Sequence, residues 1–249
     1  MIQIEYQDIV AVIKLNRGIT NAINLELVNE FSQKLREIKD NENVHSTVIC
    51  SSNEKFFSIG FDIPSLFNLS REEFSTFFKS FNKLCLDLYS FPLLTIAAIT
   101  GHATAGGCIL ALCCDYRYIA EGRKLMGLNE IKLGVPIPYP ADCILRHLVG
   151  TQKARLITDS GDFYQPAQLL QMGMVDGIFP IDKVLAKSIE EARLLSSSSL
   201  SSFRMIKRNR TEMVIEQILK HLDEREEFFI DSWYSKECRE NLEEAIKRF

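Results

Sequence analysis

The stretch GHATAGGCILALCCDYRYIAEGRKLMGLNE, residues 101–130, combines a small-residue turn, an apolar helix start and a short strand pattern. The turn at residues 105–107 leads into the apolar run that begins at Cys108. A glycine turn at a helix start leaves free backbone N–H groups that can bind an anion. The stretch ends at Glu130, which lies among uncharged neighbours and is therefore a candidate base. An anion site beside a base is the arrangement needed to form and hold an enolate.

Alternating strand and helix patterns extend outward from this stretch as far as about residue 180. Strands are expected at residues 2–6, 9–15, 45–52, 93–100, 116–120 and 174–180. Helices are expected at residues 24–40, 71–90, 151–160 and 166–172, and one from about Gly106. The alternation indicates the α/β class.

The last quarter of the chain has a different pattern. Nearly everything after residue 182 is helical in periodicity, and the serine run at 196–202 predicts a helix junction. The apolar positions of residues 203–249 need a partner surface, either on the main domain or on another subunit. We therefore expect a core domain over residues 1–195 and a C-terminal helical oligomerisation region over 196–249.

Composition narrows the class of protein. With 249 residues, 46% hydrophobic and 25% charged, the chain is typical of a globular domain with a sizeable core. The formal net charge of −4 provides no general attraction for nucleic acid. Seven cysteines, several of them in apolar runs and without a CxxC pair, favour a reducing compartment over a metal site. Since no signal-peptide or membrane-spanning pattern is evident, we expect a cytoplasmic protein without membrane association.

Three segments are candidates for chemistry, and each has an ordinary structural alternative. In FFSIGFDIPSL, Gly60 allows an unusual backbone angle, so the following N–H groups could face a cleft, or Asp62 could simply cap a helix. In TAGGCILALCCD the glycines serve either a ligand or close packing. In LMGLNEIKLG, Glu130 is either a base or a surface glutamate at a helix start.

Together, these segments resemble the crotonase superfamily, also called the enoyl-CoA hydratase/isomerase family. The resemblance also includes GITNAINLELVNEF near the start and SGDFYQPAQLLQMGMVDGIFP later, so it covers most of the chain. It implies an α/β, crotonase-like spiral of ββα units with a helical C-terminal region. It also implies a homotrimer or hexamer that binds an acyl-CoA substrate and needs no separate cofactor or metal.

The resemblance assigns roles to individual residues. The family's oxyanion hole corresponds to the backbone N–H groups of Phe61 and Gly106, which would hold the thioester oxygen. The residues that would contact substrate or CoA are Ala22, Ser58, Ile59, Gly60, Asp62 and Ile109.

One position distinguishes between the family's reactions. Family hydratases carry two glutamates, and the first of these corresponds here to Ile109, whereas the second matches Glu130. The family's Δ3,Δ2-enoyl-CoA isomerases also carry an aliphatic residue at the first position, and the sequences GLNE and Ser235-Lys236-Glu237 are similar to that subgroup. The resemblance therefore implies a 3-enoyl-CoA to 2-trans-enoyl-CoA isomerase, in which Glu130 alone moves the proton through a dienolate. The pathway that the resemblance implies for such an isomerase is fatty-acid β-oxidation.

Alternatives remain open at this level. The chain could be a hydratase, a decarboxylase or another acyl-CoA lyase of the same fold, or a non-catalytic binding protein on the same scaffold. His102 could be a second acid–base group, although a histidine bonded to backbone at a strand end is the simpler interpretation. Tyr139 and Asp142 follow the prolines of GVPIPYPADCIL and are weaker candidates for the pocket lining.

Overall fold

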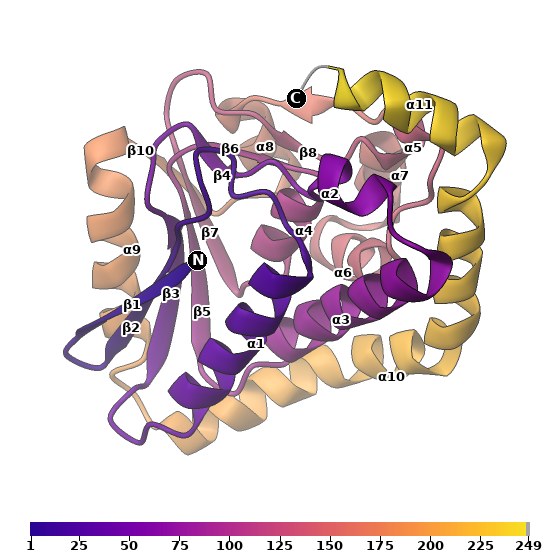
Figure 1. Ribbon diagram of the computed structural model, residues 1–249. Helices are drawn as coiled ribbons and strands as arrows, with labels where there is room; N and C mark the ends of the chain where they lie inside the picture. The colour runs from indigo at the N-terminus through magenta and orange to yellow at the C-terminus, as the bar shows by residue number, and fades with distance from the viewer. Residues whose placement is uncertain (248–249) are drawn as a thin grey trace.

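A six-stranded sheet forms the first layer of the computed structural model, which describes residues 1–247 (Figure 1). Its order is β1-β2-β3-β5-β7-β10, and only the β1–β2 pair is antiparallel. The strands are β1 (Ile2–Gln7), β2 (Val10–Leu15), β3 (Ser46–Ser51), β5 (Leu94–Ile99), β7 (Tyr116–Ala120) and β10 (Gly177–Phe179). All six correspond to strands predicted from the sequence patterns.

A second sheet of four very short strands lies at one end of the first. Its order is β4-β6-β8-β9, and its strands are β4 (Phe56–Ser58), β6 (His102–Thr104), β8 (Met126–Gly127) and β9 (Phe163–Tyr164). Along the chain, β3 is followed by β4, β5 by β6 and β7 by β8, and each pair then leads into helices. The chain thus repeats a strand–strand–helix unit.

Helices cover both faces of the six-stranded sheet. On one side lie α1 (Leu25–Lys39) and α3 (Arg71–Tyr89), and on the other lies α9 (Ile181–Leu195) (Figure 1). Asn24 caps α1, and Ser70 with Glu73 forms a capping box at the start of α3, which explains why both helices begin where the sequence predicts. The remaining helices before residue 182 are α2 (Ile63–Phe67), α4 (Gly106–Leu112), α5 (Glu130–Leu133), α6 (Tyr139–Val149), α7 (Thr151–Ser160) and α8 (Pro166–Met172).

The C-terminal helices α10 (Leu200–Trp233) and α11 (Lys236–Ile246) pack on the main domain. Helix α10 runs along α3 and α6, and α11 contacts α2 and α5. The surface that the tail requires is therefore supplied, in part, by the same chain. Several apolar side chains nevertheless stay exposed on α9 and α10: Leu194, Leu195, Met205, Ile206, Met213, Leu219 and Phe228.

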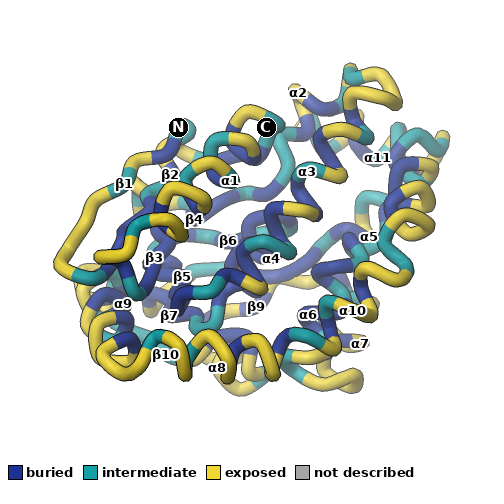
Figure 2. Tube along the Cα trace, turned by 90° about the horizontal axis from the view of Figure 1, so that it is seen from below, coloured by how far each residue is buried: buried dark blue, intermediate teal, exposed yellow. Residues whose placement is uncertain are grey.

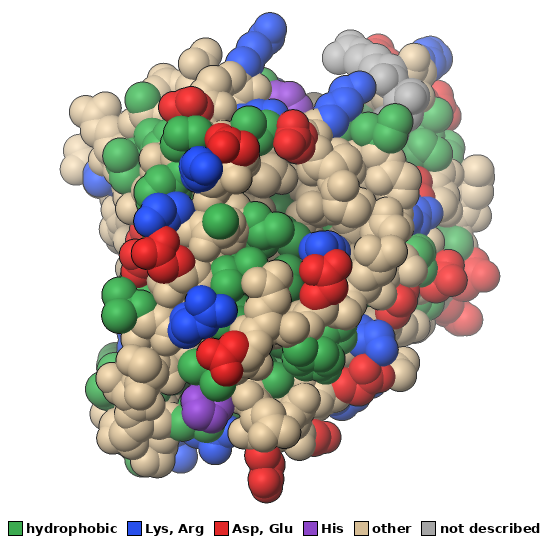
Figure 3. Space-filling model, turned by 90° about the vertical axis from the view of Figure 1, so that its left-hand side faces the viewer, with side chains coloured by type: hydrophobic (Ala, Val, Ile, Leu, Met, Phe, Trp, Pro, Cys, Tyr) green, Lys and Arg blue, Asp and Glu red, His purple; other side chains and the backbone are tan. Residues whose placement is uncertain are grey.

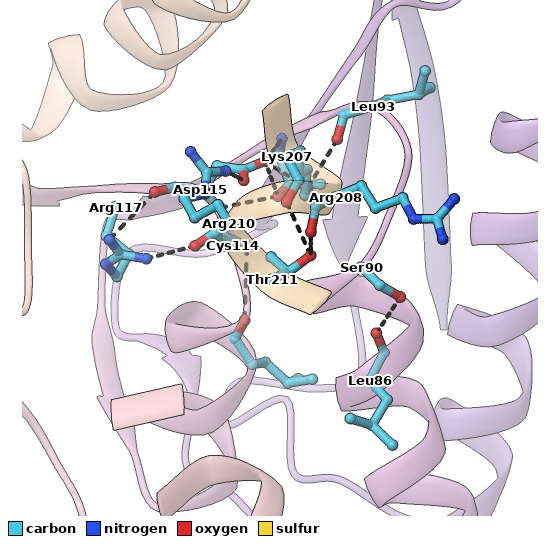
Figure 4. Close-up of polar contacts among 12 residues, drawn as sticks. Leu86, Ser90, Leu93, Cys114, Asp115, Arg117, Lys207, Arg208, Arg210 and Thr211 are labelled. Carbon is cyan, nitrogen blue, oxygen red and sulfur yellow. Dashed lines mark hydrogen bonds and ion pairs between the residues drawn. The ribbon is translucent and has the colours of Figure 1, made fainter. Parts of the chain in front are cut away.

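A buried ion pair attaches α10 to the sheet (Figure 4). Lys207 Nζ lies 2.7 Å from Asp115 Oδ2 and also donates to the carbonyl of Leu93 at 3.1 Å. Arg210 contacts Asp115 Oδ1, and Asp115 Oδ2 also accepts hydrogen bonds from the N–H and the hydroxyl of Thr95. Because both charges are paired and hydrogen-bonded, their burial is compensated.

Buried residues form two clusters, one on each side of the six-stranded sheet. In Figure 2 the helices alternate between buried and exposed residues, and the strands of the six-stranded sheet are mostly buried. All seven cysteines are buried and free, in agreement with the interpretation of cysteine as core packing. On the face seen in Figure 3, acidic and basic side chains are interspersed. Within residues 1–247, no helix is long and apolar enough to cross a membrane.

Candidate active site

A cavity of about 640 Å³ lies where the second sheet meets α2, α4, α5 and the C-terminal helices. It brings together the three segments singled out in the sequence, because Phe61, Gly106 and Glu130 all line it. The lining residues that bear on the argument below are Ile59, Phe61, Ile63, His102, Gly106, Glu130, Pro138, Phe229 and Trp233.

The turn at residues 59–62 leaves one backbone donor unused. Ile59 N–H donates to Thr20 O at 2.9 Å, Gly60 N–H to the hydroxyl of Ser58 at 3.2 Å, and Asp62 N–H to Ile23 O at 2.9 Å. The N–H of Phe61 has no acceptor among the described residues. Since buried backbone donors are nearly always paired, an unpaired one beside a cavity is available to a ligand.

The second backbone donor lies at the start of α4. Gly106 is the first residue of that helix, and its N–H also lacks an acceptor within residues 1–247. Gly60, which has a φ of +99°, lies directly against it, because a Cβ atom added at Gly60 would be 2.9 Å from the nitrogen of Gly106. The two unpaired donors therefore belong to segments in direct contact.

Glu130 is the third component of the site. It is the first residue of α5 and is only 5% exposed, and its Oε2 atom has no hydrogen-bond partner among the described residues. Burial raises the pKa of Glu130 from 4.5 to about 7, although the backbone N–H groups of Glu130 and Asn129 oppose this effect. A carboxyl group with such a pKa can both accept and release a proton near neutral pH.

Ile109 lies in the helix that carries Gly106, and it is 1% exposed. It belongs to the main apolar cluster and is absent from the described lining of the cavity. Among the residues that line the cavity within 1–247, Glu130 is thus the one buried carboxylate. Glu244, which also lines it, is exposed.

The other predicted substrate contacts lie in different environments. Ile59 lines the cavity, whereas Ala22, Ser58, Gly60 and Asp62 are absent from its described lining. Ser58 is completely buried, and its hydroxyl donates to Asn21 O at 2.8 Å. The carboxylate of Asp62 caps α2 through Ser65 N–H, as the ordinary structural interpretation expected, and it also pairs with Arg17.

His102 matches the simpler of its two interpretations. Its Nδ1 atom accepts a hydrogen bond from Leu125 N–H at 3.0 Å, and burial lowers its pKa. The ring still lines the cavity. Tyr139 and Asp142 are absent from the described lining, and Asp142 instead pairs with Arg146, while Pro138 does line the cavity.

Sequence reasoning missed the contribution of α10 to the site. Phe229 and Trp233 both line the cavity, and both are buried in a cluster of aromatic side chains that also contains Phe74 and Phe78. The apolar pattern of the tail indicated that these positions needed a partner. The pattern could not indicate that Phe229 and Trp233 border the cavity, because their position depends on the direction in which a helix of 34 residues runs across the domain.

Comparison with known proteins supports the resemblance. The model of the enoyl-CoA hydratase/isomerase family matches residues 5–249. The chain is 32% identical over 180 residues, 72% of its length, to mouse mitochondrial enoyl-CoA delta isomerase 1, and this match spans only 62% of the mouse protein. It is also 32% identical over 209 residues to the probable enoyl-CoA hydratase echA8 of Mycobacterium tuberculosis, covering 83% of this chain and 79% of that protein.

Solved structures agree on the fold. The human mitochondrial delta3-delta2-enoyl-CoA isomerase superposes with a TM-score of 0.96 at 25% identity, covering 99% of this chain and 97% of that one. The enoyl-CoA hydratase of Bacillus halodurans superposes with a TM-score of 0.90 at 20% identity, covering 98% of this chain and 99% of that one. The expected crotonase-like α/β fold with C-terminal helices is confirmed. The chain therefore belongs to the enoyl-CoA hydratase/isomerase family, within the crotonase superfamily.

Proposed function

We propose that this protein is a Δ3,Δ2-enoyl-CoA isomerase, which converts a 3-enoyl-CoA into the 2-trans-enoyl-CoA. The observation that carries the proposal is the combination of one buried carboxylate, Glu130, with two unpaired backbone donors, while an apolar residue, Ile109, stands at the position that corresponds to the first glutamate of family hydratases. Adding water to a double bond needs a water molecule held and activated between two carboxylates. Moving a proton between two carbons of one substrate needs only one.

In the proposed reaction, the thioester oxygen accepts hydrogen bonds from Phe61 N–H and Gly106 N–H. Glu130 removes a proton from carbon 2, and the electron pair moves into a dienolate whose negative charge lies largely on the thioester oxygen. The protonated Glu130 then returns the proton to carbon 4, and the double bond between carbons 2 and 3 forms. The reaction only moves a proton and a double bond within the substrate, so it needs no redox cofactor and adds no water.

The properties of the site suit these steps. A pKa of about 7 at Glu130 lies between those of an ordinary carboxylic acid and a carbon acid, which favours proton transfer in both directions. Removing one donor of an oxyanion hole typically lowers the rate about 100- to 1000-fold, so two fixed N–H groups can provide a large part of the catalysis.

A two-substrate assay tests the proposal. Incubation of the purified protein with a 3-enoyl-CoA should yield the conjugated 2-enoyl-CoA, and incubation with a 2-enoyl-CoA should yield little 3-hydroxyacyl-CoA. The alternative reaction, hydration, is supported by the relatives that carry hydratase names. Efficient formation of 3-hydroxyacyl-CoA would establish that alternative and refute the isomerase.

The quaternary structure is part of the proposal. We infer a homotrimer or a hexamer, because apolar side chains on α9 and α10 stay exposed in the single chain, among them Met213 at 80% exposure. Sedimentation equilibrium should therefore give three or six times the chain mass of 28.5 kDa. A monomer at micromolar concentration would contradict this part of the proposal.

A further inference from the structure

The side chain of Arg17 joins the two segments that form the back of the Phe61 turn. Its Nη1 atom donates to the carbonyl of Ala22 at 2.8 Å, and its Nη2 atom lies 2.6 Å from Asp62 Oδ2. A guanidinium group has a planar fork of donors, so one side chain can hold two acceptors in a fixed relative position.

These two acceptors flank the backbone contact on which the Phe61 N–H depends. Ile23 and Phe61 form an isolated parallel bridge, with Ile23 N–H donating to Gly60 O at 2.7 Å and Asp62 N–H donating to Ile23 O at 2.9 Å. Ala22 precedes Ile23, and Asp62 follows Phe61. Arg17 therefore spans the bridge from one side to the other.

The bridge needs such support because its own bonds are few. Gly60 has a φ of +99° and no side chain, so the orientation of the peptide between Gly60 and Phe61 depends on the single hydrogen bond from Ile23 N–H to Gly60 O. No protein acceptor within residues 1–247 holds the N–H of Phe61 itself. The Phe61 ring is fixed between Phe77 and Phe81, with ring centroids 4.9 Å away in both cases, but this contact restrains the side chain more than the peptide plane.

The Arg17–Asp62 ion pair is shielded enough from solvent to stabilise the turn. The Arg17 side chain is 26% exposed and that of Asp62 is 15% exposed, and a short charge-assisted hydrogen bond in such a setting is stronger than a fully solvated pair. The loop that carries Arg17 is itself fixed, because Arg17 N–H donates to Asn21 Oδ1 at 2.8 Å and Asn21 is completely buried.

We propose that Arg17 is a positioning residue, whose guanidinium clamps Ala22 to Asp62 and thereby keeps the Phe61 N–H aimed at the thioester oxygen. This inference rests on the proposed function for the identity of the ligand. It also gives Asp62 a different role from the CoA contact expected from the resemblance, since its carboxylate serves the clamp and the cap of α2.

The first test compares two ligands that differ only in the thioester carbonyl oxygen. A saturated acyl-CoA thioester offers the carbonyl oxygen, and the S-alkyl-CoA thioether of the same length lacks it. We expect wild-type protein to bind the thioester more tightly, Arg17→Met to lose most of that preference, and Arg17→Lys to be intermediate because an ammonium group has no fork. The kcat of Arg17→Met should fall about 100-fold, the low end of the loss of one oxyanion donor, with a smaller change in KM.

The matched control is Arg71→Met, which removes an exposed arginine that pairs with Asp231 and Glu227, and none of these three residues is in the described cavity lining. This variant should keep the wild-type thioester preference and kcat. Unchanged preference and kcat in a folded Arg17→Met variant would overturn the clamp.

A second measurement does not depend on the ligand. Amide hydrogen exchange should become faster over residues 59–62 in Arg17→Met and stay unchanged in β5, because the clamp restrains only the turn. Unaltered exchange over residues 59–62 would overturn the clamp whatever the substrate is. Conversely, a wild-type protein that binds no acyl-CoA would refute the proposed function, and the exchange result would still decide the role of Arg17.

Discussion

At the scale of single residues, the site depends on groups that lack partners. Glu130 Oε2, Phe61 N–H and Gly106 N–H have no hydrogen-bond partner among the described residues, although polar groups inside proteins are nearly always satisfied. Leaving a buried polar group unpaired costs about 1–3 kcal/mol, and a ligand that hydrogen-bonds to such a group recovers part of this cost. The three groups border one cavity, and the proposed thioester would complete the two donors.

Replacing Glu130 by Gln should abolish isomerisation while preserving acyl-CoA binding. Loss of the acid–base group is expected to lower kcat by about 1000-fold or more. In the wild type, kcat/KM should rise with pH up to about 7, because the base must be deprotonated. The matched control is Glu226→Gln, since Glu226 is also buried with a raised pKa but is absent from the described cavity lining.

The same substitution has a consequence for stability. The folded-state pKa of Glu130 is raised from 4.5 to about 7, so the folded protein binds the proton more tightly than the unfolded chain. Wild-type stability should therefore fall by about 3 kcal/mol between pH 4.5 and pH 7 relative to Glu130→Gln. Denaturant titrations of both proteins across this range check the sign, and parallel pH dependences would refute the buried, titrating Glu130.

Gly60→Ala should strongly reduce activity. Its Cβ would lie 2.9 Å from Gly106 N and from Thr104 O, so the two N–H donors could not keep their spacing, and we expect a loss of about 100-fold or more in kcat. Gly173→Ala is the control, because Gly173 also has a positive φ, +81°, but open space around it. Both variants bear the strain of an alanine at positive φ, but only Gly60→Ala adds a clash at the donors, so the steady-state rates of the folded proteins should differ. Equal activities would contradict the proposed oxyanion hole.

At the scale of elements, the sequence patterns predicted most of the longer segments, but they missed helix α6 and the shortest strands. Helices α1 and α3 were predicted because each has an apolar stripe and a capping residue. The strands of the second sheet have two or three residues each, which is too short for a period-two pattern to be recognised. These strands are nevertheless what places Ile59, Thr104 and Asn129 around the cavity.

Helix α10 gives the cavity an aromatic wall that should limit the acyl chain. Trp233 is 1% exposed and stacks on Phe74 at 4.3 Å, and its Nε1 atom has no acceptor among the described residues. Trp233→Phe should therefore cost little stability and should shift the chain-length optimum of kcat/KM toward longer acyl-CoAs. Phe78→Leu alters the same cluster, where Phe78 stacks on Phe229 at 4.0 Å, but outside the described lining. An identical shift in both variants would show that cluster packing, and not the wall, sets the optimum.

At the scale of the whole molecule, the path of the chain brings the three parts of the site together. Phe61, Gly106 and Glu130 follow β4, β6 and β8, which are neighbours in the second sheet, so three distant segments meet at one edge. The sequence identified these three residues through their resemblance to a known family. It could not predict the hydrogen bonds that leave Phe61 N–H unpaired, or the clamp at Arg17, since these depend on contacts between residues far apart in the chain.

The most direct test of a single proton carrier is to follow the proton. A 3-enoyl-CoA carrying deuterium at carbon 2 is incubated with the enzyme, and the product is examined by mass spectrometry and NMR. The account predicts 2-trans-enoyl-CoA with part of the deuterium at carbon 4, because the buried Glu130 returns what it removed, and no transfer by Glu130→Gln. A product heavier by one water, or efficient isomerisation by Glu130→Gln, would contradict it.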